Sequence, residues 1–140
     1  MAWIAANCEP CVVTEEQLAL RAEIMRAFAA TGAPPAVAPS PALDALVERH
    51  VAVLDGSGAI LMAHPFAAHR DGARVEAGGR EWWGNCAWDA FGIVAALGLA
   101  DAVVTAQGVT LPVRDGEPDG DAVFHVEVPA ARWWDDVGYT

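Results

Sequence analysis

The segment that most constrains the fold is residues 86–97, CAWDAFGIVAAL, in which Asp89 is the only charged residue. Asn85 before it is a favoured helix N-cap, and Gly98 after it is a common helix terminator, so the sequence predicts a helix from about 86 to 97. A helix that is apolar on nearly all sides has to be buried by other elements. This helix is therefore expected at the centre of the fold.

Segments rich in strand-forming residues lie on both sides of this helix. Before it, VAVL and AILMAHPF flank the turn sequence at 55–58, and ARVEA and REWW flank the glycines at 78–79, so two hairpins are predicted. After it, strands are expected at 102–106, 109–113 and 122–128, with the acidic, turn-rich RDGEPDGD before the last one. A central helix against short, mainly antiparallel strands predicts the α+β class.

Two further helices are expected before the first hairpin. Thr14 and Gln17 have the spacing of a capping box, and apolar residues then recur at helical spacing, which predicts a helix over 15–31. A proline-rich linker ends this helix. Ser40 as N-cap, with a proline after it, begins a shorter helix over about 41–50.

The two helices and the first hairpin together suggest a winged helix. We therefore expect an N-terminal helical, winged-helix-like region at 1–66 and a compact core at 67–140. A winged helix often binds DNA, but the chain has eight basic residues against nineteen acidic ones and a net charge of −11. Because this charge repels phosphate backbones, we expect no nucleic-acid partner and assign the region to packing or to covering a substrate.

Composition also bears on location. Hydrophobic residues make up 54% of the chain, but no apolar run approaches the ~20 residues of a membrane span. The N-terminus MAWIAANCEPCVV lacks the basic start and continuous apolar core of a signal peptide. We therefore expect a cytoplasmic protein with no membrane partner.

The start of the apolar helix carries the residues best suited to chemistry. With Asn85 as N-cap, Cys86 is expected in the first turn, where backbone N–H groups and the helix dipole stabilise an anion. Its thiol pKa is then predicted to lie below the free value of about 8.5. Asp89 lies three residues further on the same face, so a soft nucleophile stands beside a proton-carrying group. Three tryptophans are expected to wall off water around the pair: Trp82, Trp83 and Trp88. The alternative is that Cys86 is a small core residue and Asp89 only complements the helix dipole.

NCAWDAFGIVAALG resembles the segment around the first catalytic cysteine of the alkylmercury (organomercurial) lyase family. The likeness extends through LMAHPFAAH upstream and VFHVEVPAARWWDDVGYT downstream, and covers roughly residues 50–140. The resemblance implies a winged-helix-like N-terminal portion, a compact core, and cleavage of a carbon–mercury bond by protonolysis without a cofactor. It also implies that Cys86 is a mercury-binding thiolate and Asp89 the proton shuttle, with an organomercurial or Hg(II) as substrate and small thiols as partners.

The family's second catalytic cysteine lies just beyond a segment resembling PAARWWDDVGYT, and no cysteine follows Cys86 in these 140 residues. Cys8 and Cys11 form a C-x-x-C unit of the kind used by redox dithiols and metal sites. They are either incidental thiols on the N-terminus or the source of the missing sulfur. A thiol remains the donor that a soft metal prefers.

Other readings stay open. A metal site can be drawn from His64, His69, His125 and Glu127, but their spacings match no strong pattern, and ordinary hydrogen-bonded histidines are expected. For function, the alternatives to a lyase are a divergent relative that uses the thiol/acid pair on a non-mercurial small molecule, and a non-catalytic protein that binds a soft metal or ligand. A regulatory winged-helix module is the least favoured by the charge balance.

Overall fold

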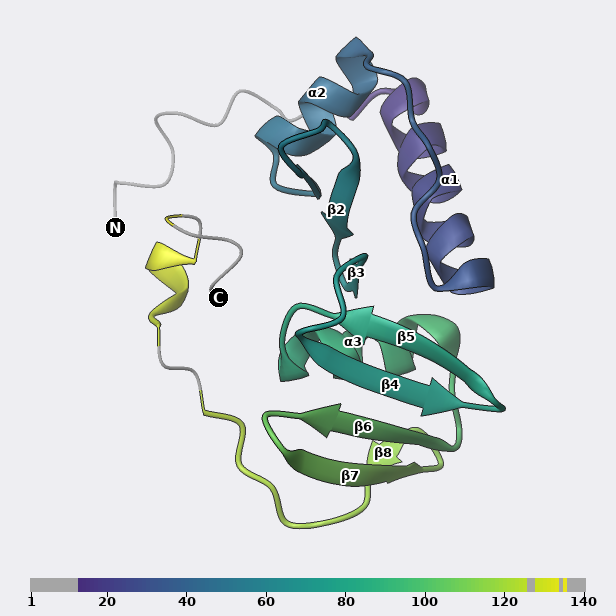
Figure 1. The fold of residues 1–140 in the computed structure, drawn as a ribbon, viewed down its shortest axis with the longest axis vertical. Coiled ribbons are helices and arrows are strands. Elements are labelled where there is room, and N and C mark those ends of the chain that lie inside the picture. The colour runs from purple at the N-terminus through teal and green to yellow at the C-terminus, as the bar shows by residue number, and fades with distance from the viewer. Residues whose placement is uncertain (1–12, 126–127, 134, 136–140) are drawn as a thin grey trace.

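The computed structural model describes residues 13–125, 128–133 and 135 (Figure 1). Within these residues the chain forms three α-helices, a short 3-10 helix and two antiparallel sheets, which confirms the α+β class. The helices are α1 (Glu15–Thr31), α2 (Pro41–Glu48), α3 (Ala87–Leu97) and η1 (Ala130–Arg132). The strands are β1 (Ala52–Leu54), β2 (Ile60–Ala63), β3 (Phe66–Ala67), β4 (Ala73–Ala77), β5 (Arg80–Gly84), β6 (Ala102–Ala106), β7 (Val109–Arg114) and β8 (Glu117–Pro118).

Both N-terminal helices begin where their capping residues predict. The Thr14 hydroxyl accepts a hydrogen bond from the Gln17 backbone N–H, and the Gln17 side chain accepts one from the Thr14 backbone, which completes the capping box of α1. Gly32 ends α1 in the left-handed conformation, with a φ of 72°. The Ser40 hydroxyl caps α2 by accepting from the Leu43 backbone N–H.

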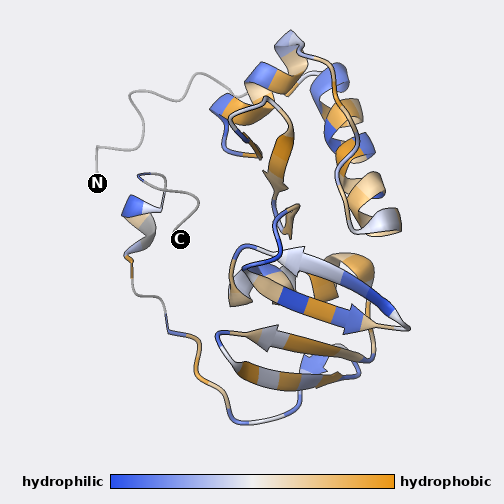
Figure 2. Cartoon of the chain, viewed as in Figure 1, coloured by the Kyte–Doolittle hydropathy of each residue, from blue (hydrophilic) through white to orange (hydrophobic). Residues whose placement is uncertain are grey.

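The first hairpin belongs to a small sheet with strand order β1-β2-β3. Its turn is held by the Asp55 carboxylate, which accepts hydrogen bonds from the backbone N–H groups of Ser57 and Ala59 at 2.8 and 3.0 Å. The helices and hairpin on which the winged-helix expectation rests are thus present. Figure 2 shows β2 apolar along its length, as its burial between neighbouring elements requires.

The second sheet has the order β5-β4-β6-β7-β8, and α3 packs against β4, β5 and β6 (Figure 1). The predicted hairpin of β4 and β5 and the predicted strands β6 and β7 are confirmed. Figure 2 shows polar and apolar residues alternating along β4, and the apolar ones are buried on the α3 side. The apolar helix is therefore covered as its sequence demands.

The predicted strand at 122–128 is wrong over the described residues 122–125, which have no regular secondary structure. The edge beyond β7 is taken instead by β8, in the segment predicted to be loop, after a tight turn at Asp115 and Gly116. Val123 and Phe124 are consequently 94% and 44% exposed.

A single buried cluster joins the two sheets and the helices. Phe28 of α1 stacks on Phe66 of β3, with ring centroids 5.4 Å apart, and Ile93 of α3 and Val75 of β4 lie in the same cluster. Helix α1 is thus packed on β3. No helix in the described part of the chain is long and apolar enough to cross a membrane.

Candidate active site

Cys86 and Asp89 lie together at the start of α3. The Cys86 thiol donates to Asp89 Oδ2 at an S···O distance of 3.7 Å. Cys86 is half-buried, and the Asp89 side chain is 13% exposed. The three-residue spacing therefore brings the two groups into contact, as predicted.

The predicted N-cap is wrong by one residue. Cys86 itself caps α3, with an extended backbone and no side-chain capping hydrogen bond, whereas Asn85 was expected there. The reason is that β5 continues to Gly84, so the chain needs both following residues to turn from the strand into the helix. The sulfur therefore lies at the edge of the first turn and not within it.

The expected fall in the thiol pKa is also wrong, because burial raises the pKa of Cys86, and the charge of Asp89 and its hydrogen bond raise it further. The backbone N–H groups of Asp89 and Trp88 act in the predicted, lowering direction, but burial outweighs them. The thiol is consequently protonated at neutral pH.

Alkylation of Cys86 by iodoacetamide tests this state. Since the thiolate is the nucleophile, Cys86 is expected to react more slowly than N-acetylcysteine at neutral pH, and its rate should rise with pH to above the ordinary thiol pKa. Peptide mass spectrometry resolves Cys86 from Cys8 and Cys11. A rate that has already levelled off at neutral pH would contradict the raised pKa.

The three tryptophans do not gather around the pair. Trp82 is only 3% exposed and donates from Nε1 to the Ala29 carbonyl of α1 at 3.2 Å, so it is a core residue and cannot line a substrate pocket. Trp83 points to the opposite face of β5, as strand alternation requires. Trp88 is 67% exposed and meets Phe124 at a centroid distance of 5.8 Å. The prediction that Trp82 helps to exclude water from the pair is therefore wrong. Trp88 is too exposed to exclude water.

His64 is the residue that sequence reasoning missed at this site. Its Nδ1 lies 3.6 Å from Asp89 Oδ1, and its side chain is 32% exposed. His64 was considered only as one member of a possible metal site. Nothing in the local pattern links it to Asp89, because it comes from the turn between β2 and β3, far from α3 in the sequence.

Two glycines allow these elements to approach one another. A Cβ at Gly84 would lie 2.7 Å from Asp89 Cβ, and a Cβ at Gly92 would lie 3.0 Å from Pro65 Cβ. Any larger residue would push α3 away from the end of β5 or from the turn that carries His64. The geometry of the site thus depends on these two close contacts.

Among the described residues, the other predicted ligands form no metal site with the pair. Cys8 and Cys11 lie outside the described residues. His69 interacts with Asp71, and this contact holds the Asp71 pKa below its ordinary value. Among the described residues no group of three or more histidine, cysteine or acidic side chains has metal-binding geometry.

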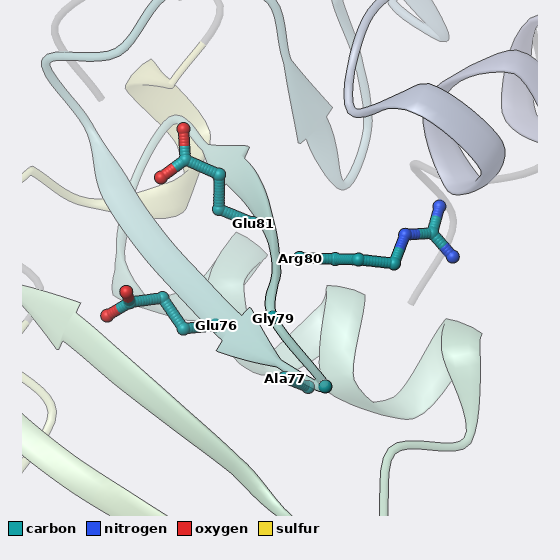
Figure 3. Close-up of a pocket in the computed structure, with 6 residues that line it drawn as sticks. Glu76, Ala77, Gly79, Arg80 and Glu81 are labelled. Atoms are coloured by element: carbon teal, nitrogen blue, oxygen red, sulfur yellow. The ribbon is translucent and has the colours of Figure 1, made fainter.

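The tip of the β4–β5 hairpin encloses an open hollow of about 400 Å³, far from Cys86 at the other end of β5. Figure 3 shows the Glu76 and Glu81 carboxylates on one side of the hairpin and the Arg80 guanidinium on the other. Each glutamate forms an ion pair with a neighbouring arginine, and Arg80 donates to the Ala29 carbonyl at 2.8 Å. These charges are paired with one another or with the backbone, and no thiol, hydroxyl or imidazole of the described residues lines the hollow.

Comparison with known families points to the segment that holds the pair. A model of the MerB alkylmercury lyase family matches residues 66–140, more than half of the chain, and this range includes both Cys86 and Asp89. No curated protein and no solved structure matches the chain.

Proposed function

Because this chain belongs to the alkylmercury lyase family, we propose that it cleaves the carbon–mercury bond of an organomercurial by protonolysis. Cys86 binds the mercury, and Asp89 carries the proton. The observation that supports these roles is the 3.7 Å contact between Cys86 Sγ and Asp89 Oδ2 in a partly buried position. A thiol is the soft donor that mercury prefers, and a carboxyl is a suitable proton carrier.

The raised pKa of Cys86 gives the proton a defined origin. When the sulfur bonds to the mercury of R–Hg–X, X⁻ leaves and the thiol proton passes to Asp89 Oδ2. The carboxyl then protonates the carbon on mercury, the electron pair of the carbon–mercury bond becomes the new C–H bond, and R–H departs. Hg(II) remains on Cys86.

Release of the metal requires further sulfur. Two small thiols, R′SH, convert the Cys86-bound Hg(II) into Hg(SR′)₂, return a proton to Cys86 and release one to solvent. Cys8 and Cys11 are the only other thiols in these 140 residues and are the alternative source of this sulfur. A variant with serine at both positions separates the two: unchanged turnover with excess small thiol assigns release to the small thiol, and lost turnover assigns it to the N-terminal pair.

The test is incubation of the protein with a phenylmercury salt and excess small thiol, followed by gas chromatography for benzene. We expect benzene in excess over protein, and none from Cys86→Ser. Tight mercury uptake without benzene would reject the lyase in favour of a soft-metal binder. Neither uptake nor benzene would favour a non-mercurial substrate for the same thiol/acid pair.

A further inference from the structure

The two oxygens of the Asp89 carboxylate face different partners. Oδ2 lies 3.7 Å from Cys86 Sγ, and Oδ1 lies 3.6 Å from His64 Nδ1. The thiol and the carboxylate share the start of α3, whereas the imidazole comes from the turn between β2 and β3. The carboxylate is therefore placed between a group on its own helix and one on a separate element.

The turn that carries His64 is held firmly. Its flanking residues Ala63 and Phe66 pair with one another between β2 and β3 and are 3% and 2% exposed. Pro65 packs against α3 at Gly92, where even a Cβ would come within 3.0 Å. The imidazole is thus attached to a rigid part of the core and can hold another side chain in place.

Asp89 needs such a partner. The terminal torsion of an aspartate is broad, so helix geometry alone does not decide which way the carboxylate plane faces. With 13% exposure of its side chain, Asp89 also has little solvent to hold its second oxygen. A donor on Oδ1 keeps Oδ2 directed at the thiol.

We propose that His64 is a positioning residue for the lyase reaction: its Nδ1, 3.6 Å from Asp89 Oδ1, closes to a hydrogen bond when substrate is bound and keeps Oδ2 facing the thiol proton and the carbon that receives it. This role rests on the proposed function. It follows the general arrangement in which a reactive pair is oriented by a third group.

The kinetic test compares His64→Leu with His64→Asn, since the asparagine amide places an N–H donor close to the position of Nδ1. His64→Leu is expected to lower kcat for benzene release by about 100-fold, the loss typical of a misplaced catalytic group, with little change in KM. His64→Asn should recover most of kcat. His69→Leu is the matched control and should behave as wild type, because His69 contacts Asp71 outside the site.

A wild-type kcat in His64→Leu, or an equal loss in both His64 variants, would overturn the proposal. Circular dichroism shows whether each variant is folded, and a second measurement needs no variant to retain activity.

That measurement is long-range ¹H–¹⁵N NMR of ¹⁵N-histidine-labelled wild-type protein without substrate, with the His64 signals identified by their loss in His64→Asn. The proposal requires a proton on Nδ1, and a ring protonated only at Nε2 would reject it. If wild-type protein releases no benzene, the proposed function fails, while this spectrum still decides whether His64 carries the Nδ1 proton that the proposal requires.

Discussion

Asp89→Asn is expected to lower benzene release by about 10²- to 10⁴-fold, the range by which a positioned proton donor accelerates a reaction. An amide keeps the size of the side chain but cannot carry the proton from Cys86 to carbon. Because Oδ2 lies 3.7 Å from the sulfur, the same substitution also changes the pKa of the Cys86 thiol.

Alkylation of Cys86 is expected to change in the opposite direction. Asp89 raises the pKa of Cys86 through its charge and its hydrogen bond, so its neutralisation lowers that pKa and speeds reaction with iodoacetamide at neutral pH. Unfolding would also expose the thiol and speed its alkylation, so circular dichroism and a Tm equal to that of wild type are needed to assign the effect to the lost carboxylate. Asp71→Asn is the control, since this carboxylate is 88% exposed and faces His69. Benzene release at the wild-type rate by Asp89→Asn would remove Asp89 from the mechanism.

The second large effect is on stability. Phe28→Ala is expected to lower the free energy of unfolding by about 4 kcal/mol, as large-to-small substitutions in cores do. Phe28 is 0% exposed, and its ring stacks on Phe66 with an interplanar angle of 7°. The substitution leaves a cavity between α1 and the strand that follows His64 and Pro65.

Thermal or urea unfolding followed by circular dichroism measures this loss, which corresponds to a Tm lower by roughly 12 °C for a domain of this size. Leu18→Ala on the same helix is the matched control, because Leu18 is 54% exposed and its removal should change Tm little. Equal effects of the two substitutions would show that α1 is not anchored to the core through Phe28.

Much of the fold follows from local sequence patterns. The capping box at Thr14, the Ser40 cap and the turn at 55–58 each depend on residues within a few positions of one another, and all three are present. The contact between Cys86 and Asp89 is also a local feature, because helix periodicity alone brings residues three positions apart together.

The errors arise where a distant element decides the outcome. The alternation of apolar residues from Phe124 to Val128 is present in the sequence, but β8 occupies the sheet edge next to β7. Trp82 stands next to the reactive segment in sequence, yet its indole is buried and bonded to the end of α1. The residues next to a segment in sequence do not show which strand occupies a sheet edge. Nor do they show which distant group a buried indole bonds to.

The sequence by itself determined the helices, most of the strands and the thiol/acid pair, since hydrogen bonding and side-chain spacing along a helix act over a few residues. Only the tertiary structure decided the protonation of Cys86 and the placement of His64 beside Asp89. Both depend on burial and on the close approach of α3 to Pro65 at Gly92, which are properties of packed elements and not of any one segment.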